Sequence, residues 1–306
     1  MSLVYIVQQI MAYSGIFFLV FGMFGNTMSI YIFSSVPTYR RTPATFYFLI
    51  ESIFKILFLI INLLPRVVVL VIGYDFTNTS SFWCKLRQGT LIVSATIAIT
   101  LASLCMIDQY LITSSNASVR RLSQIKISHR VSFIITVICC LHAIPFYLYI
   151  EISPITKTCV PVNPGLAAYV PIYFLIILCG IPASILLIFG SLTYRNIRRT
   201  INLSERCADR QLLKMTVLQI ILLVCCTGPL GVYYLYSLFT SEIIKDQDRI
   251  TKEYLAYAMI STEQGFYYSS SFYIFLFSSR VFRRHVKQRL LRQRRTNSVV
   301  PNNQIQ

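Results

Sequence analysis

The side chains best suited to chemistry in this chain are a few charged residues and thiols set within long apolar stretches. Cys84 precedes Tyr110 of the triplet Asp108-Gln109-Tyr110 by 26 residues. At about 1.5 Å of rise per residue, that separation is roughly 39 Å of helix, the depth of a bilayer with its interfaces. The spacing predicts one helix with the cysteine at one face of a membrane and the acidic triplet at the other.

Another apolar stretch contains two opposite charges, Glu51 and Lys55, four residues apart. Glutamate and lysine at this spacing and in this order meet on one face of a helix. A lone lysine near the middle of a membrane costs roughly 2.5 to 3.5 kcal/mol. We therefore expect an intramembrane ion pair facing the protein interior, either structural or able to bias two alternative packings.

Catalytic and metal-binding chemistry has little support in the sequence. His142 is the single histidine in an apolar block, and it has no evident partner for acid–base or metal chemistry. We expect no enzyme activity, no metal site and no cofactor.

The composition is that of a membrane protein, since 55% of the 306 residues are apolar and 13% are charged. The apolar residues fall into blocks long enough to cross about 30 Å of hydrocarbon. We predict an all-α membrane protein, a seven-transmembrane helix bundle with a short amphipathic C-terminal helix. The predicted spans are 10–33, 44–72, 90–113, 131–150, 167–192, 212–239 and 254–277.

The orientation follows from the basic residues, because Lys and Arg concentrate in cytoplasmic loops. Most of the 28 Lys and Arg residues lie on alternate loops and in the C-terminal tail, so residues 1–9 are predicted outside and 281–306 in the cytoplasm. The tail alternates apolar and basic residues, as in a helix that lies on anionic inner-leaflet lipids. This placement accounts for the net charge of +17 without nucleic-acid binding.

Nine cysteines are present, and six of them lie inside apolar blocks. Cys207 is predicted to be cytoplasmic and reduced, whereas Cys84 and Cys159 are the two predicted at the oxidising outer face. We predict one disulfide between Cys84 and Cys159. Asn78 begins an Asn-x-Thr/Ser glycosylation sequon in an outer loop.

A cysteine about one membrane depth before Asp-x-Tyr resembles the third helix of rhodopsin-like (class A) G-protein-coupled receptors. The resemblance covers roughly residues 25–282 and implies a divergent, orphan-type member with a receptor domain over 10–280. It implies a plasma-membrane receptor that transduces binding of an extracellular ligand to heterotrimeric G proteins. Further matches are Gly25-Asn26 and the prolines Pro145, Pro182 and Pro229.

The switch residues that the resemblance implies are altered in this chain. Gln109 stands where the family has arginine, and Asp209 stands at the acidic position at the base of the sixth span. Gln109 can share a hydrogen bond with Asp209 but cannot form an ion pair. Thr227 replaces the tryptophan two residues before Pro229. We expect a weaker lock between the third and sixth spans, with raised basal activity or weak coupling.

The resemblance places the ligand in the outer half, between the third, fifth, sixth and seventh spans. Leu91 matches the position of the aspartate in amine receptors, which disfavours a monoamine. The seventh span has no lysine for a retinal Schiff base. A peptide or a small polar molecule fits best, and the candidate contacts are Arg66, Leu91, Ala95, Tyr233, Tyr234, Glu263 and Tyr267.

The altered motifs also suit a different class of protein. A non-signalling seven-helix binding or scavenger protein, or a heterodimer partner, would not need the family's arginine or tryptophan. A transporter or channel would be expected to show internal repeats or a line of intramembrane charges, and the sequence has neither.

Overall fold

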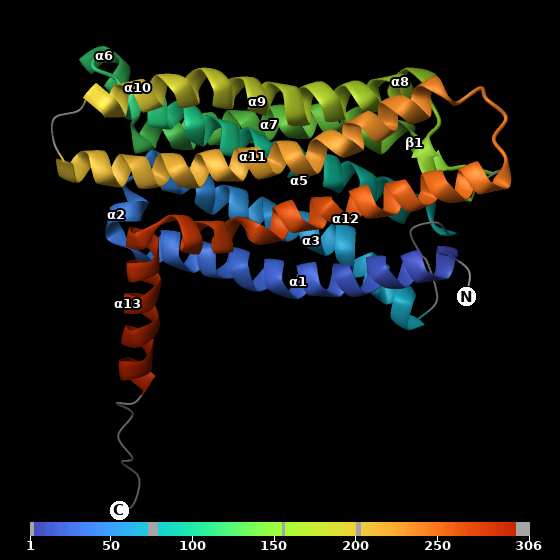
Figure 1. Ribbon diagram of the computed structural model, residues 1–306, viewed down its shortest axis with the longest axis horizontal. Coiled ribbons are helices and arrows are strands. Elements are labelled where there is room, and N and C mark those ends of the chain that lie inside the picture. Colours follow the sequence, from blue (N-terminus) through green and yellow to red (C-terminus); the bar gives the residue numbers. More distant parts are fainter. Residues whose placement is uncertain (1–2, 73–78, 155–156, 200–202, 298–306) are drawn as a thin grey trace, which may run out of the picture.

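The chain folds into long, roughly parallel helices, as the computed structural model describes for residues 3–72, 79–154, 157–199 and 203–297 (Figure 1). Within these ranges, six helices are long and apolar enough to cross a membrane. The protein is therefore an all-α, multi-pass membrane protein, as predicted. These spans are Gln9–Ser35, Pro43–Val69, Ser81–Thr113, Ile125–Tyr149, Pro164–Arg199 and Arg210–Phe239.

Each long helix begins before its predicted apolar block, because backbone hydrogen bonding continues into the flanking polar residues. The fourth ends at Tyr149, one residue before the predicted end at 150, because Ile150 belongs to a short strand. The first begins at Leu3, so most of the predicted segment 1–9 is helical. The long helices are α1 (Leu3–Ser35), α3 (Pro43–Ile72), α5 (Ser81–Thr113), α7 (Ile125–Tyr149), α11 (Leu203–Phe239) and α12 (Gln247–Ser278).

The fifth apolar block forms one continuous helical segment with changes of pitch. It consists of α8 (Pro164–Ile172), the π-helix η1 (Tyr173–Gly180), α9 (Ile181–Ile185), the π-helix η2 (Leu186–Gly190) and α10 (Ser191–Arg199). The short connecting helices are α2 (Pro37–Arg40) and α6 (Ala117–Arg120).

Helix α12 occupies the predicted seventh span but is more polar than the six apolar helices. It contains Ser269, Ser270 and Ser271, all buried. Among the long helices, it packs most extensively against α1, α11 and α3. The serines are thus satisfied inside the protein, where a hydroxyl can bond to a neighbouring backbone carbonyl, as Ser269 does to Phe18 O at 2.8 Å.

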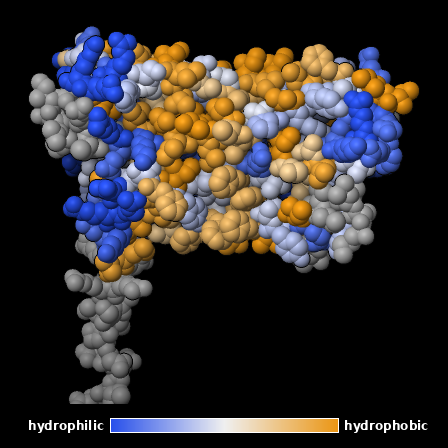
Figure 2. Space-filling model, viewed as in Figure 1, coloured by the Kyte–Doolittle hydropathy of each residue, from blue (hydrophilic) through white to orange (hydrophobic). Residues whose placement is uncertain are grey.

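Helix α5 lies at the centre of the arrangement. It packs against α3, α7, α10 and α11, and a larger share of its span is buried than of the other five apolar helices. Side chains at the periphery remain exposed, including Phe133 at 71% and Leu187 at 70%. Figure 2 shows the resulting apolar band between two polar ends, as expected for a surface in contact with lipid.

One end of the molecule contains the predicted disulfide, and this prediction is confirmed. Cys84 in the first turn of α5 is bonded to Cys159 in β2 (Cys159–Pro161), which pairs antiparallel with β1 (Ile150–Ile152). We call this the disulfide end. Helix α5 runs from it to Asp108-Gln109-Tyr110 at the opposite end, which we call the triplet end.

Gly25-Asn26 brings α1 close to α12. A Cβ atom at Gly25 would lie 3.1 Å from Phe272 Cβ, so a larger residue would require Phe272 or its helix to shift by a few tenths of an ångström. Asn26 is buried, and its Nδ2 donates to Gly22 O at 2.8 Å and to Tyr268 O at 3.0 Å. The pair therefore joins two helices by close approach and one interhelical hydrogen bond.

The chain turns sharply at Ser279, and α13 (Arg280–Asn297) leaves the long helices nearly at a right angle (Figure 1). Gln211 Oε1 of α11 accepts from Ser279 Oγ at 2.9 Å and from Val281 N at 3.1 Å. Phe282 is completely buried beneath the turn. The predicted amphipathic C-terminal helix is thus present at the triplet end, beginning one residue before the predicted boundary at 281.

Candidate functional site

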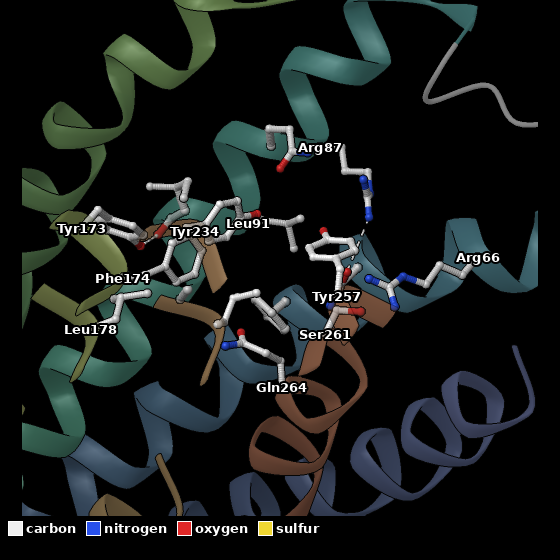
Figure 3. Close-up of a pocket in the computed structure, with 16 residues that line it drawn as sticks. Arg66, Arg87, Leu91, Tyr173, Phe174, Leu178, Tyr234, Tyr257, Ser261 and Gln264 are labelled. Atoms are coloured by element: carbon white, nitrogen blue, oxygen red, sulfur yellow. Dashed lines mark hydrogen bonds between the residues drawn. The ribbon is translucent and has the colours of Figure 1, made fainter. Parts of the chain in front are cut away.

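A cavity of about 110 Å³ lies in the half of the molecule nearer the disulfide end (Figure 3). Its walls come from α3, α5, η1, α11 and α12, five elements distant from one another in the sequence. Four residues predicted to contact a ligand line it: Arg66, Leu91, Ala95 and Tyr234.

The polar and apolar walls of this cavity are on different sides. In Figure 3, Arg66 and Arg87 lie on one side, whereas Tyr173, Phe174 and Leu178 of η1 lie on the other. Arg87 Nη2 donates to Asn62 Oδ1 at 3.5 Å, which connects α5 to α3. On the apolar side, Tyr173 is fixed by a hydrogen bond between its hydroxyl and Thr96 Oγ1 at 2.8 Å.

Three predicted ligand contacts do not line this cavity, and their part in ligand binding stays a prediction. Glu263 is exposed on α12, and the next residue, Gln264, faces the cavity instead. Tyr233 lines a separate groove between α11 and α12. Successive helical residues point about 100° apart, so the rotation of a helix about its axis decides which of two neighbours faces the cavity.

The third residue, Tyr267, belongs to a buried polar cluster near the cavity. Its ring centroid lies 4.3 Å from Lys55 Nζ. Lys55 Nζ is 2.6 Å from Glu51 Oε1, so the predicted ion pair is formed, and it also donates to Ser271 Oγ at 2.5 Å. Gln219 Nε2 donates to Glu51. We call these residues the Lys55 cluster, and it joins α3, α11 and α12.

At the triplet end, Asp108 and Gln109 are both buried. Asp108 Oδ1 accepts a hydrogen bond from Ser123 Oγ at 2.6 Å. Gln109 is 1% exposed, and its Oε1 has no hydrogen-bond partner among the described residues. The Tyr110 ring packs edge-on against Phe189 of η2 with centroids 5.5 Å apart.

The predicted contact between Gln109 and Asp209 stays a prediction, because the side chain of Asp209 lies outside the described residues. Asn78, the predicted glycosylation site, also lies outside them. Thr227 is buried within α11, two residues before Pro229, which remains inside this helix.

Sequence reasoning missed Arg87, Tyr257 and Ser261 as cavity residues. A signal was available for Arg87, since it lies one helical turn inward from Cys84, whose partner fixes that end of α5. No comparable signal existed for Tyr257 and Ser261 of α12, a helix whose polar residues occur on several faces. In the part of the chain that the structure describes, no group of three or more His, Cys, Asp or Glu residues is arranged to hold a metal ion.

No protein-family model matches the sequence, and no curated protein is significantly similar to it.

Proposed function

We propose that this protein is a divergent rhodopsin-like receptor that transduces binding of a small extracellular ligand to heterotrimeric G proteins. In this proposal it lies in the plasma membrane with the disulfide end outside and the triplet end in the cytoplasm. The observation that supports it most strongly is the course of α5, which lines the cavity near one end and holds Asp108-Gln109-Tyr110 at the other.

The proposal makes α12 the seventh membrane span. At about 1.5 Å per residue, its 32 residues extend for roughly 48 Å, more than the thickness of a bilayer's hydrocarbon core. The buried serines do not argue against a membrane position, because their hydroxyls bond within the protein rather than facing lipid.

The Lys55 cluster offers a physical route from the cavity to the triplet end. Gln219 and Ser271 lie deeper in α11 and α12 than the cavity residues Leu230 and Gln264. A ligand that binds more tightly to one packing of these helices shifts the equilibrium toward that packing. The cluster must rearrange when α11 and α12 move relative to α3, so it couples the two ends.

A second candidate is a non-signalling binding protein or heterodimer partner of the same fold. The buried Gln109, with an amide oxygen that lacks a partner among the described residues, favours it. A glutamine cannot provide the mobile positive charge that the family's arginine provides, so such a protein could bind ligand without activating a G protein.

Nucleotide exchange separates these candidates. The full chain in lipid nanodiscs would be mixed with purified heterotrimers of several Gα classes, and GTPγS uptake measured without added ligand for the wild type and Gln109→Arg. We expect the wild type to make nucleotide exchange faster than it is for the heterotrimer alone. The exchange rate with Gln109→Arg should differ severalfold from the rate with the wild type, because arginine can pair with Asp108.

The matched control is Gln124→Arg, which adds the same charge at an exposed position of the triplet end. It should behave as the wild type. If neither the wild type nor Gln109→Arg accelerates exchange with any Gα class, the receptor proposal fails and the non-signalling candidate replaces it.

A further inference from the structure

The cavity has an unusual charge balance for a membrane-embedded site. Its walls include two guanidinium groups, those of Arg66 and Arg87, and none of its lining residues is an aspartate or a glutamate. The exposed Glu263 is on α12 but outside the cavity, and Glu51 is neutralised by Lys55 at 2.6 Å. The field inside the cavity therefore favours a negatively charged group.

Gln264 adds a hydrogen-bond donor to the same space. It is 8% exposed, lines the cavity, and its amide nitrogen has no partner among the described residues. A buried donor without a partner is unfavourable by about 1–3 kcal/mol, and an acceptor supplied by a ligand would remove that penalty. Both arginines and this amide favour an acceptor oxygen.

The opposite wall accepts an apolar group. Tyr173, Phe174 and Leu178 present ring and alkyl surface across from the arginines (Figure 3). The volume of about 110 Å³ is smaller than the 150 Å³ of a closed apolar cavity known to hold benzene, so it sets an upper limit on the enclosed part of a ligand. Because this cavity is only partly enclosed, the rest of the ligand can extend beyond it. A short alkyl body, or an aromatic ring no larger than benzene, with one anionic substituent matches this division of the walls.

We propose that the ligand of this cavity is a small organic carboxylate with an aromatic or short alkyl body. The role of this acid as an agonist rests on the proposed receptor function, whereas its binding does not. The carboxylate lies at Arg87 and Arg66, where a guanidinium can donate two parallel hydrogen bonds to its oxygens. The apolar body lies against η1, and amines are excluded by charge repulsion.

Binding is tested on the full chain in lipid nanodiscs by its melting temperature and by calorimetry. The probes are benzoate, its neutral isostere benzamide and the cationic benzylamine. We expect benzoate to raise the melting temperature and the other two to leave it unchanged. Phenylacetate and butyrate extend the test to a longer aromatic acid and an aliphatic one.

Variants then locate the bound acid. Arg87→Gln and Arg66→Gln should each weaken benzoate binding about tenfold or more, since each loses a charge-assisted hydrogen bond. Arg87→Lys should weaken benzoate binding less than Arg87→Gln, because lysine keeps the positive charge although it lacks the paired donors of the guanidinium group. Ala95→Leu should block binding by filling the cavity. Melting without ligand shows whether each variant is folded.

The matched control is Lys157→Gln, which removes an exposed cation of the disulfide end outside the cavity and should not affect binding. The inference is overturned if none of the three acids binds, if benzamide or benzylamine binds as tightly as benzoate, or if Ala95→Leu binds benzoate like the wild type. Benzoate binding without stimulated nucleotide exchange would instead refute the receptor function and leave the ligand class standing. If benzylamine stimulated nucleotide exchange and the acids did not, the receptor function would stand and the carboxylate ligand class would be refuted.

Discussion

The ammonium nitrogen of Lys55 lies 2.6 Å from a carboxylate oxygen of Glu51, and the two side chains are 0% and 2% exposed. Two opposite charges are thus held together inside a helical membrane protein, one turn apart on α3. The pair continues through Ser271 to α12 and through Gln219 to α11. It is therefore placed to affect both stability and the relative positions of three helices.

Removing one of the two charges of this pair should strongly destabilise the protein. Glu51→Gln leaves Lys55 buried without its counter-charge, which costs about 3–5 kcal/mol in soluble proteins. The double variant Glu51→Gln/Lys55→Met removes both charges. Its melting temperature should be closer to that of the wild type than the melting temperature of Glu51→Gln is. Melting temperatures in nanodiscs measure both. Asp248→Asn, which breaks the exposed i,i+4 pair with Lys252, is the control and should melt like the wild type. A wild-type melting temperature for Glu51→Gln would contradict this account.

Loss of the disulfide should loosen the disulfide end. The bond closes a loop of 75 residues and connects β2 to α5. Cys84→Ala/Cys159→Ala should lower stability by roughly 2–4 kcal/mol, chiefly because the unfolded chain becomes freer. Dithiothreitol should lower the wild-type melting temperature toward that of the variant. Cys140→Ala, which alters an exposed free thiol, should leave the response to dithiothreitol intact.

The hydrogen bond from Ser123 to Asp108 should hold the loop between α5 and α7 in place. Ser123→Ala removes a charge-assisted bond of 2.6 Å, and such bonds contribute about 1.5–3 kcal/mol. We expect faster backbone hydrogen exchange in residues 114–124 of the variant, measured by mass spectrometry. Ser118→Ala, at an exposed position of the same loop, should exchange as the wild type does. Equal exchange in both variants would mean that the bond does not order the loop.

Stability at the disulfide end should depend on pH through Glu151 in β1. Hydrogen bonds from Ser81 and Lys85 lower the pKa of Glu151 below its ordinary value of 4.5. A lowered pKa in the folded state stabilises the protein above the unfolded pKa, and this stabilisation is lost as the pH falls through the folded pKa. Glu151→Gln should therefore melt below the wild type at neutral pH, and the difference should close at acid pH.

The control for this titration is Glu242→Gln, which removes an exposed carboxylate from the loop before α12. At neutral pH it should melt as the wild type does, because the carboxylate that it removes is exposed. A difference for Glu151→Gln that persists unchanged at acid pH would show that the glutamine acts through packing rather than through charge.

Anionic lipid should stabilise α13 against the membrane surface. Arg280, Arg284 and Lys287 are exposed at i, i+4 and i+7 and thus share one face of the helix. Each cation near a negatively charged leaflet gains about 1 kcal/mol. In nanodiscs containing phosphatidylserine, hydrogen exchange in α13 should be slower than in phosphatidylcholine alone.

Replacing these three residues with glutamine should remove that lipid dependence, whereas Arg280→Lys/Arg284→Lys should keep it because the charge is retained. Arg283 is excluded from the set because its Nη1 donates to Leu276 O at 2.7 Å and Phe277 O at 3.0 Å at the end of α12. Lipid dependence that survives the triple substitution would show that the apolar face of α13 is sufficient.

The sequence by itself determined the features that depend on distance along the chain. Hydrophobic length predicted the helices, because a bilayer requires a fixed number of apolar residues per span. The spacing of Glu51 and Lys55 predicted their ion pair, because the helical repeat fixes neighbours on one helix. The predicted membrane topology placed two cysteines, Cys84 and Cys159, at the outer face, and these two form the disulfide.

Only the tertiary structure decided which side of each helix faces the cavity. The choice of Gln264 over Glu263, and of Tyr234 over Tyr233, depends on the rotation of α12 and α11 about their axes. That rotation is set by packing between helices, such as the close approach at Gly25, and one residue of error turns a side chain by about 100°. Arg87 and Arg66 line one cavity, and Gln219 donates a hydrogen bond to Glu51. In both cases the residues are on different helices, and no local spacing in the sequence relates them.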